Sequence, residues 1–318
     1  MILQKEEKKQ NMAKIISITG DLGSGKSTVS DILCKRLNYE YIYTGKIYRE
    51  IANKYNMTPL ELNQYSETHP NIDEEIDSTF KSLNEATNLI VDSRLAWFFI
   101  PISFKVFLKT NLIISVNRIS NDSQRNDERY SSNEEAANKI IARKLSENKR
   151  YMEFYGANCS DLSNFNLIID TSFITPERVA DIIIEEFNLW LVSRVCSKSF
   201  VSPTNLYPTQ SIRGFGSEYF KNIQNNMKEH TYDLDFPIIA VNIDSFDYIF
   251  DGHKRTSCAI INKIDLIPVI YQDENACFSK GLSYKTEILN SIKLSLFYDW
   301  EDFNSFKYLI YPTILGMN

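Results

Sequence analysis

The chain has 318 residues, of which 43% are hydrophobic and 24% charged, which is typical of a globular protein with about two domains. A formal net charge of −6 excludes a broad basic surface, so we expect no nucleic-acid partner. The five cysteines have no metal-ligand spacing, as is usual for reduced thiols in the cytoplasm.

The first residues do not resemble a targeting segment. Residues 1–12 form a charged extension without the apolar core of a signal peptide. The most apolar stretch, residues 95–108, is interrupted by Pro101 and Lys105 and is too short to cross a bilayer. We therefore expect a cytoplasmic protein that has no membrane partner.

A phosphate-binding motif follows the first predicted strand. Residues 15–19 are rich in isoleucine, residues 20–27 read GDLGSGKS, and an amphipathic helix is predicted over 28–37. This strand, G-x-x-x-x-G-K-[ST] loop and helix are typical of a site for a nucleoside triphosphate, whose phosphates accept from backbone N–H groups. The residues expected to bind ATP are Gly20, Gly23, Ser24, Gly25, Lys26, Ser27 and Thr28. Lys26 would act in catalysis by reaching the outer phosphates, and the Ser27 hydroxyl would hold Mg²⁺.

Strands and helices alternate through the first 190 residues. This order predicts an α/β fold, a parallel sheet with helices on both faces. Further strands are predicted over residues 89–92, 105–108 and 167–170. Helices are predicted over residues 58–65, 71–83, 132–155 and 176–191.

Two segments carry arginines suited to bind the phosphate of a second substrate. Thr44 lies in a Thr-Gly turn, and Arg49 follows it by about one helical turn. A solvated surface arginine is the alternative for Arg49. Arg94 follows the strand that ends at Asp92, at the edge where open α/β sheets bind ligands.

The helix predicted over residues 132–155 carries two arginines on one face. Arg143 and Arg150 are seven residues apart, close to two helical turns. Read without other information, such a basic face is usually only solvated. Arg118, Arg125 and Arg129, just upstream, are weaker candidates for the same role.

These motifs, in this order, resemble the cytidylate kinase family, and specifically its shorter archaeal-type branch. The resemblance covers about residues 13–190 and includes the runs DSRLAW at 92–97, KRY at 149–151, DLS at 161–163 and IDT at 169–171. It implies transfer of the ATP γ-phosphoryl group to CMP or dCMP, with Mg²⁺.

The resemblance also implies roles for the residues above. Thr44, Arg49 and Arg94 would bind the acceptor nucleotide. Asp92 would hold Mg²⁺ through water or contact the acceptor ribose, and a strand-end carboxylate with neither role is the alternative. The catalytic arginines Arg143 and Arg150 would lie on a lid that neutralises charge on the transferring group and excludes water. No general base is required, because the acceptor phosphate is already an anion.

Three residues depart from the family pattern. Lys144 follows the lid arginine where an acid is more usual, and Asn166 stands where an aspartate is usual. Trp97 replaces a small residue after Arg-Leu-Ala. We expect the indole and the lost carboxylate to lie near the acceptor pocket and to change the choice of acceptor.

The second half of the chain has a different character. Residues 193–216 are rich in proline, glycine, serine and threonine, which predicts a linker or loop and a division into domains 13–192 and 193–318. Strands are predicted over 237–243, 248–250 and 266–271, with a helix over 255–262 and another over 284–300.

A run of charged residues opens the helix that follows the strand over 248–250. Asp251, Gly252, His253 and Arg255, with Lys254, surround a helix N-terminus, which favours an anion. The alternative for His253 is a capping or core histidine, and for Asp251 a simple turn residue.

This run and the upstream segment from 206 to 213 resemble the ParB/sulfiredoxin-like superfamily over about residues 200–272. The resemblance implies a small α+β domain with a phosphorylated or nucleotide ligand, and the closest variant is that of the free-serine kinases. Those kinases use a glutamate as base, whereas the nearest position here is Gln210, and Glu218 is off the pattern. Phosphate binding is therefore expected more than serine-kinase chemistry.

Three hypotheses follow. The first is a nucleoside monophosphate kinase with an appended ligand-binding domain. The second is a bifunctional kinase of a specialised pathway, whose C-terminal half binds or phosphorylates another small molecule. The third is a nucleotide-sensing regulatory protein that no longer turns over.

Overall fold

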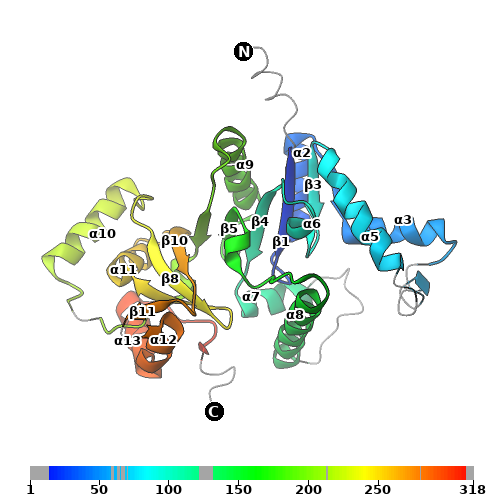
Figure 1. Cartoon of the computed structure of the whole chain (residues 1–318). Helices are drawn as coiled ribbons and strands as arrows, with labels where there is room; N and C mark the ends of the chain where they lie inside the picture. Colours follow the sequence, from blue (N-terminus) through cyan, green and yellow to red (C-terminus); the bar gives the residue numbers. More distant parts are fainter. Residues whose placement is uncertain are drawn as a thin grey trace. The chain divides into compact units, whose positions relative to one another are not determined.

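The computed structural model describes residues 14–58, 61–62, 65, 69, 71–121, 132–212, 214–279 and 281–312 (Figure 1). These residues group into two compact units. The first contains the described residues of Met1–Thr110, Tyr130–Leu167 and Thr175–Ser197. The second contains those of Asn111–Arg129, Ile168–Ile174 and Lys198–Asn318. None of the helices in the described ranges is both long and apolar enough to span a bilayer.

A parallel sheet forms the centre of the first unit. Its strands lie in the order β2-β3-β1-β4, and each adjacent pair is parallel. Their bounds are Glu40–Tyr43 for β2, Leu89–Asp92 for β3, Ile15–Gly20 for β1 and Phe104–Lys109 for β4. All six residues of β1 are buried, and because side chains alternate along a strand, both faces of the sheet are covered there. The prediction of a parallel sheet with helices is confirmed.

Helices follow the strands of the first unit. Their bounds are Lys26–Leu37 for α2, Thr44–Lys54 for α3, Asn71–Ser82 for α5, Ala96–Phe99 for α6, Asn133–Tyr155 for α8 and Pro176–Ser193 for α9, with a 3₁₀ turn η1 at Leu83–Glu85. Ser132 caps α8 by accepting from the Glu135 N–H, and Thr175 caps α9 in the same way. The helices predicted over 71–83, 132–155 and 176–191 are confirmed, and part of the one over 58–65 lies outside the described residues.

Six strands and a separate core make up the second unit. Its strand order is β5-β6-β10-β8-β9-β7, and all of β5 except Leu167 belongs to this unit. The bounds are Leu167–Asp170 for β5, Lys198–Val201 for β6, Leu206–Tyr207 for β7, Ile238–Ile243 for β8, Phe246–Asp251 for β9 and Ile267–Gln272 for β10. A short hairpin joins β11 (Cys277–Ser279) and β12 (Leu282–Ser283).

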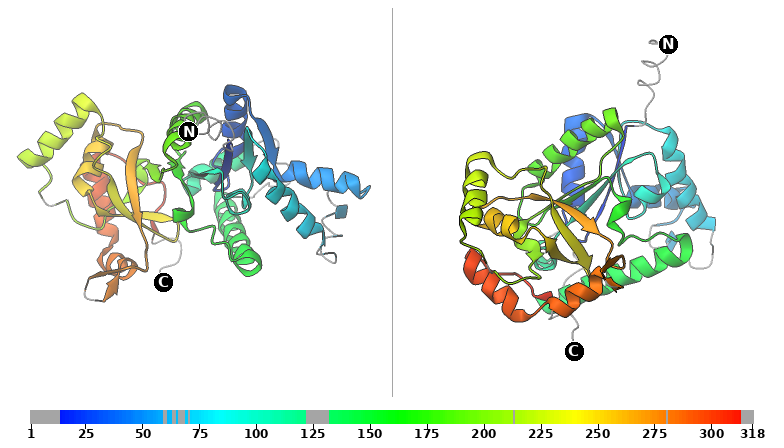
Figure 2. Two further views of the ribbon diagram at one scale, coloured as in Figure 1. Left: turned by 45° about the horizontal axis from the view of Figure 1, so that its top comes forward. Right: turned by 60° about the vertical axis from the view of Figure 1, so that its left-hand side comes forward.

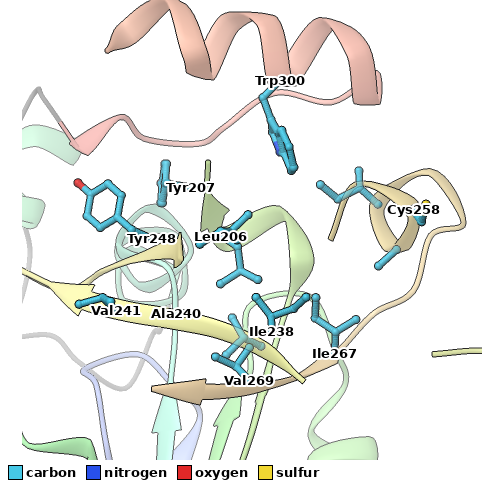
Figure 3. Close-up of a cluster of buried hydrophobic side chains, with 14 of the residues drawn as sticks. Leu206, Tyr207, Ile238, Ala240, Val241, Tyr248, Cys258, Ile267, Val269 and Trp300 are labelled. Atoms are coloured by element: carbon cyan, nitrogen blue, oxygen red, sulfur yellow. The ribbon is translucent and has the colours of Figure 1, made fainter. Parts of the chain in front are cut away.

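Helices also belong to the second unit, and Figure 2 shows some of them beside its strands. Their bounds are Leu112–Ser120 for α7, Glu218–His230 for α10, His253–Ile261 for α11, Tyr284–Ser291 for α12 and Leu294–Asn304 for α13. A 3₁₀ turn, η3, lies at Pro203–Asn205 in the same unit, and another, η2, lies at Leu162–Asn164 in the first unit. Figure 3 shows Trp300 pointing from α13 toward Leu206 and the buried strand residues. Trp300 and Phe297 are completely buried, so α13 is part of this core.

Two predictions for the second half were wrong. The segment expected to be a loop contains the strands β6 and β7, because Val201, Leu206 and Tyr207 are buried in the core. The single helix expected over 284–300 is two helices, with extended backbone at Ile292 and Lys293 between them. That break lets α13 turn its aromatic residues inward.

The predicted boundary between consecutive domains at 192 and 193 remains a prediction. The compact units instead divide the chain in an interleaved way, since residues 168–174 belong to the second unit. Buried Asp170 accepts hydrogen bonds from the Ser202 N–H (3.1 Å) and from Asn205 Nδ2 (2.7 Å), which connects that segment to the start of β7.

Candidate active site

The loop over residues 20–27 connects β1 to α2 as predicted. A Cβ added at Gly20 would lie 2.2 Å from the Leu108 carbonyl oxygen of the neighbouring β4, so no side chain fits there. Gly25 has a φ of 83° and turns the chain into the helix that begins at Lys26. The loop therefore starts at the carboxyl end of the central strand and leads directly into a helix N-terminus, the geometry of an anion site.

The Lys26 ammonium lies over this loop. Its Nζ donates to the carbonyl oxygens of Gly20 (3.2 Å) and Asp21 (3.0 Å). The positive charge is thus held within the curve of the backbone, where it can bind phosphate oxygens.

Asp92 and Ser27 contribute oxygen atoms to the same edge of the sheet. Asp92 ends β3 and is paired in register with Ile18 of β1. The Tyr41 hydroxyl donates to Asp92 Oδ2 (3.2 Å) and also interacts with the Ser27 side chain. Burial raises the pKa of Asp92, and the nearby Lys26 and Arg94 charges only partly oppose this.

A hydroxyl and a carboxylate are ligands that suit Mg²⁺. Within the described residues no cluster of three or more histidine, cysteine or acidic side chains could hold a metal. A magnesium ion at Ser27 and Asp92 would therefore take its other ligands from phosphate groups and water, as Mg²⁺ commonly does.

Arg94 and Arg143 meet at one carboxylate. Arg94 donates to the Gly20 carbonyl, and its Nε lies 3.1 Å from Glu147 Oε2. The other carboxylate oxygen of Glu147 accepts from Arg143 Nε at 2.9 Å. The fold thus brings a predicted acceptor residue and a predicted lid residue together, through an acid of α8 that the sequence analysis did not single out.

The remaining predicted site residues lie further out. Thr44 is exposed at the start of α3, directly after Tyr43, which pairs in register with Asp92. Arg49 donates to the Tyr43 hydroxyl and lies 5.2 Å from the centre of that ring. Arg150 is exposed and lies over the Tyr151 ring. The roles of these residues stay predictions.

A second ion pair joins α8 to the phosphate loop. Lys144 Nζ lies 3.0 Å from Asp21 Oδ1, and the Thr110 N–H donates to the other carboxylate oxygen (3.2 Å). Burial by itself would raise the pKa of Asp21, but the Lys144 ammonium and these hydrogen bonds outweigh it and hold the pKa below its usual value. Asp21 lies at a variable position of the loop motif, so the sequence contained no signal for this contact.

We expect Asp21→Asn to lower Tm at pH 7 by roughly 2–4 °C, the shift that about 1 kcal/mol produces in a domain of this size. The folded-state pKa is lowered, so the ionised carboxylate stabilises the fold above the usual value of about 4, and this contribution disappears as pH falls through the folded-state pKa. The variant should therefore lose less Tm than the wild type between about pH 5 and pH 3.

Thermal unfolding followed by circular dichroism across this pH range measures both effects. Asp31→Asn, which changes an exposed carboxylate on α2, is the matched control and should behave as the wild type. If Tm fell equally in Asp21→Asn and in the wild type between about pH 5 and pH 3, the stabilising role of the Asp21 carboxylate would be contradicted.

Asn166 does not lie near the acceptor pocket, so that expectation was wrong. Its Oδ1 accepts from the Lys105 N–H (2.9 Å), and its backbone N–H donates to the Lys105 carbonyl (2.8 Å). These bonds place Asn166 at the amino end of β4, whereas the phosphate loop contacts Leu108 at the carboxyl end. An amide suits this position better than a carboxylate would, because its Nδ2 also donates to the Cys196 carbonyl, which an ionised carboxylate cannot do.

Trp97 and Arg118 also have structural partners. The Trp97 ring is buried against Phe165, and its Nε1 donates to the Arg94 carbonyl (3.1 Å), so it supports the backbone of the Arg94 segment. Arg118, a weak lid candidate, donates to Thr171 in the second unit. Arg125 and Arg129 lie outside the described residues.

The second predicted site opens α11. His253 is buried, and its Nε2 accepts from the Thr209 N–H at 3.1 Å. Burial lowers the pKa of His253 to about 4, so the imidazole is neutral near pH 7 and can act as that acceptor. This geometry is that of a core histidine that connects the strand end at 207–209 to the helix.

Arg255 and Asp251 form an ion pair beside that helix N-terminus. Arg255 Nη2 lies 2.9 Å from Asp251 Oδ2, and Nη1 donates to the carbonyls of Phe236 and Pro237. Gly252 has a φ of 103°, and a Cβ there would lie 2.5 Å from Ile238 Cδ1. The turn is therefore restricted to glycine, and it holds the pair close to the first N–H groups of α11.

Comparison with known proteins identifies relatives of the first half of the chain. The model of the cytidylate kinase-like family matches residues 15–173. A cytidylate kinase from Sulfolobus acidocaldarius is 36% identical over 172 residues, which cover 53% of this chain and 91% of that protein. A cytidylate kinase from Thermoplasma volcanium is 36% identical over 178 residues, covering 54% of this chain and 90% of that protein.

Among solved structures, shikimate kinase from Bacteroides thetaiotaomicron has a TM-score of 0.42 and 17% sequence identity, and the match covers 55% of this chain and 98% of that chain. The matches to the two cytidylate kinases cover 53% and 54% of the chain.

Proposed function

The chain belongs to the cytidylate kinase-like family, and from this premise we propose that it transfers the γ-phosphoryl group of ATP to CMP or dCMP. Family membership makes the first half a nucleoside monophosphate kinase. The observation that carries the proposal is the position of Arg94, whose guanidinium touches both the Gly20 carbonyl of the phosphate loop and Glu147 of α8. An acceptor phosphate bound by Arg94 would lie beside the outer phosphates of a bound triphosphate.

The proposal gives each predicted site residue a role. The loop N–H groups and Lys26 bind the donor phosphates, and Arg94, with Arg49 and Thr44, orients the acceptor. Arg143 and Arg150 on α8 neutralise charge on the transferring group. Mg²⁺, held by Ser27 and Asp92, would supply charge neutralisation between the phosphates.

An acceptor screen tests this function. The full chain is incubated with ATP and Mg²⁺ and with each of CMP, dCMP, UMP, AMP and GMP, and product diphosphates are quantified. We expect CMP and dCMP to have the largest kcat/KM. Tight ATP binding without transfer to any monophosphate would support the nucleotide-sensing alternative instead.

For the second unit we propose a ParB-like domain that binds a phosphorylated or nucleotide ligand at Asp251, Gly252 and Arg255, with His253 positioning the turn through its contact with Thr209. The support is the order β7, α10, β8, β9, α11, β10 and the contact between Thr209 and His253, which joins the upstream segment to the charged run. Gln210 is exposed next to Thr209 and cannot accept a proton, so the proposal is binding and not serine phosphorylation.

We expect Arg255→Ala to weaken binding of that ligand by about 10-fold or more, because a charge-assisted hydrogen bond is lost. Thermal shift and calorimetry with nucleotides, inorganic phosphate and phosphoserine provide the measurement, and CMP phosphorylation should stay unchanged. Lys228→Ala, in the last turn of α10, is the control. If neither Arg255→Ala nor Asp251→Asn changes the binding of any of these compounds, the site is absent.

A further inference from the structure

A cavity of about 810 Å³ lies in the first unit, away from the phosphate loop. It is lined by Asn84, Pro101, Ile102, Ser103, Lys105, Ser163, Asn164, Phe165, Asn166, Trp190, Arg194, Cys196 and Ser197. Lys105 is near the amino end of β4, about 10 Å along the strand from Leu108, which contacts the loop. The volume is within the range of small-molecule sites.

The charges of this cavity are all of one sign. Among the described residues that line it are two cations, Lys105 and Arg194, and no acid. The chain as a whole has more acidic than basic residues, so a lining with cations and no acid differs from its average composition. Neither side chain forms an ion pair within the described residues, and burial lowers the pKa of both groups without an opposing acid.

Several neutral polar groups of the wall are already hydrogen-bonded inside the protein. Asn84 Nδ2 donates to the Lys81 and Phe99 carbonyls, and Asn164 Nδ2 to the Asn158 and Asp161 carbonyls. Asn166 uses both ends of its amide, as described above. The two cations are the charged donors that this wall offers to a ligand.

The position of Arg194 is specified by the fold. It ends α9 in the left-handed region, with a φ of 56°, a conformation that is costly for a residue with a Cβ. Its guanidinium lies 4.0 Å from the centre of the Trp190 ring, a cation–π contact that leaves the N–H edges available. Arg194 is exposed, and the stacking on Trp190 fixes an orientation of its guanidinium that a surface arginine without such a contact would lack.

We propose that this cavity is a second binding site of the kinase unit, which takes a small organic anion carrying a phosphate or carboxylate group between Lys105 and Arg194. Two cations with a planar guanidinium favour an anion with at least two oxygen acceptors. The site does not share residues with the phosphate loop, so its occupant would be an effector or a ligand distinct from the reacting nucleotides.

Calorimetry of the full chain tests this proposal. Inorganic phosphate is the probe for a phosphate group, and succinate is the probe for a carboxylate group. Wild type is compared with Lys105→Met combined with Arg194→Met. Anion binding at the Gly20–Ser27 loop is common to both proteins and cancels in the difference. The control is Lys35→Met combined with Arg178→Met, which removes two exposed cations from α2 and the opposite end of α9.

We expect wild type to bind one more equivalent of at least one probe, and the double variant to bind it about 10-fold more weakly or not at all. The control should stay within about twofold of wild type. If the double variant does not fold, Lys105→Gln alone gives the same comparison, and Lys105→Arg should restore binding. Equal stoichiometry and affinity for both probes in wild type and the cavity variants would overturn the proposal.

Discussion

Lys26→Met should lower the kcat of phosphoryl transfer by about 10³-fold or more while the protein stays folded. The methionine keeps most of the length of the side chain but removes the ammonium that donates to the loop carbonyls of Gly20 and Asp21. Charge developing on the transferring group would then be left without its nearest cation. Initial rates with ATP and CMP at saturation measure the loss.

Lys35→Met is the matched control, because Lys35 is in the last turn of the same helix and exposed. It should keep kcat within about twofold of wild type and have a similar Tm. A Lys26→Met enzyme with near-wild-type kcat would show that the loop does not take part in the reaction.

The second large effect is expected for Arg94→Ala, which should lower kcat/KM for the acceptor by about 10²–10³-fold. Arg94 is the predicted acceptor residue closest to the phosphate loop, so the loss should fall on the acceptor and not on ATP. Initial rates over a range of CMP concentrations, with ATP affinity measured separately by calorimetry, distinguish the two.

Arg94→Lys sharpens this test. A lysine keeps the charge but lacks the planar fork that can contact Gly20, Glu147 and a phosphate together, so it should recover only a small part of the activity. Arg36→Ala, which breaks an exposed ion pair with Asp181, is the control and should remain fully active. Unchanged kcat/KM in Arg94→Ala would remove Arg94 from the acceptor site.

The sequence was most informative where neighbouring residues decide the structure. The strand over 15–19, the loop and the helix after it form as predicted, because β-branched residues, glycines and an amphipathic run act locally. The strands at 89–92 and 167–170 also agree with the prediction, since both are short apolar runs that end in aspartate.

Predictions failed where burial in a core overrides local composition. Proline, serine and threonine between residues 202 and 209 indicated a loop, yet Leu206 and Tyr207 are buried and form β7. The C-terminal region has continuous helical periodicity, but packing of Phe297 and Trp300 requires a break at Ile292. Local propensity is weak compared with the free energy of burying such large side chains.

By itself, the sequence predicted a phosphate-binding loop on a parallel α/β sheet and placed the first half with kinases of nucleoside monophosphates. Only the tertiary structure decided which charges meet. Glu147 joins Arg94 to Arg143, and Lys144 reaches Asp21 from more than 120 residues away along the chain. It also places Asn166 at the amino end of β4, opposite to the end that contacts the phosphate loop, where Asn166 lines a cavity without acidic residues. The physical reason is that a motif depends on adjacent residues, whereas an ion pair depends on distances that only packing sets.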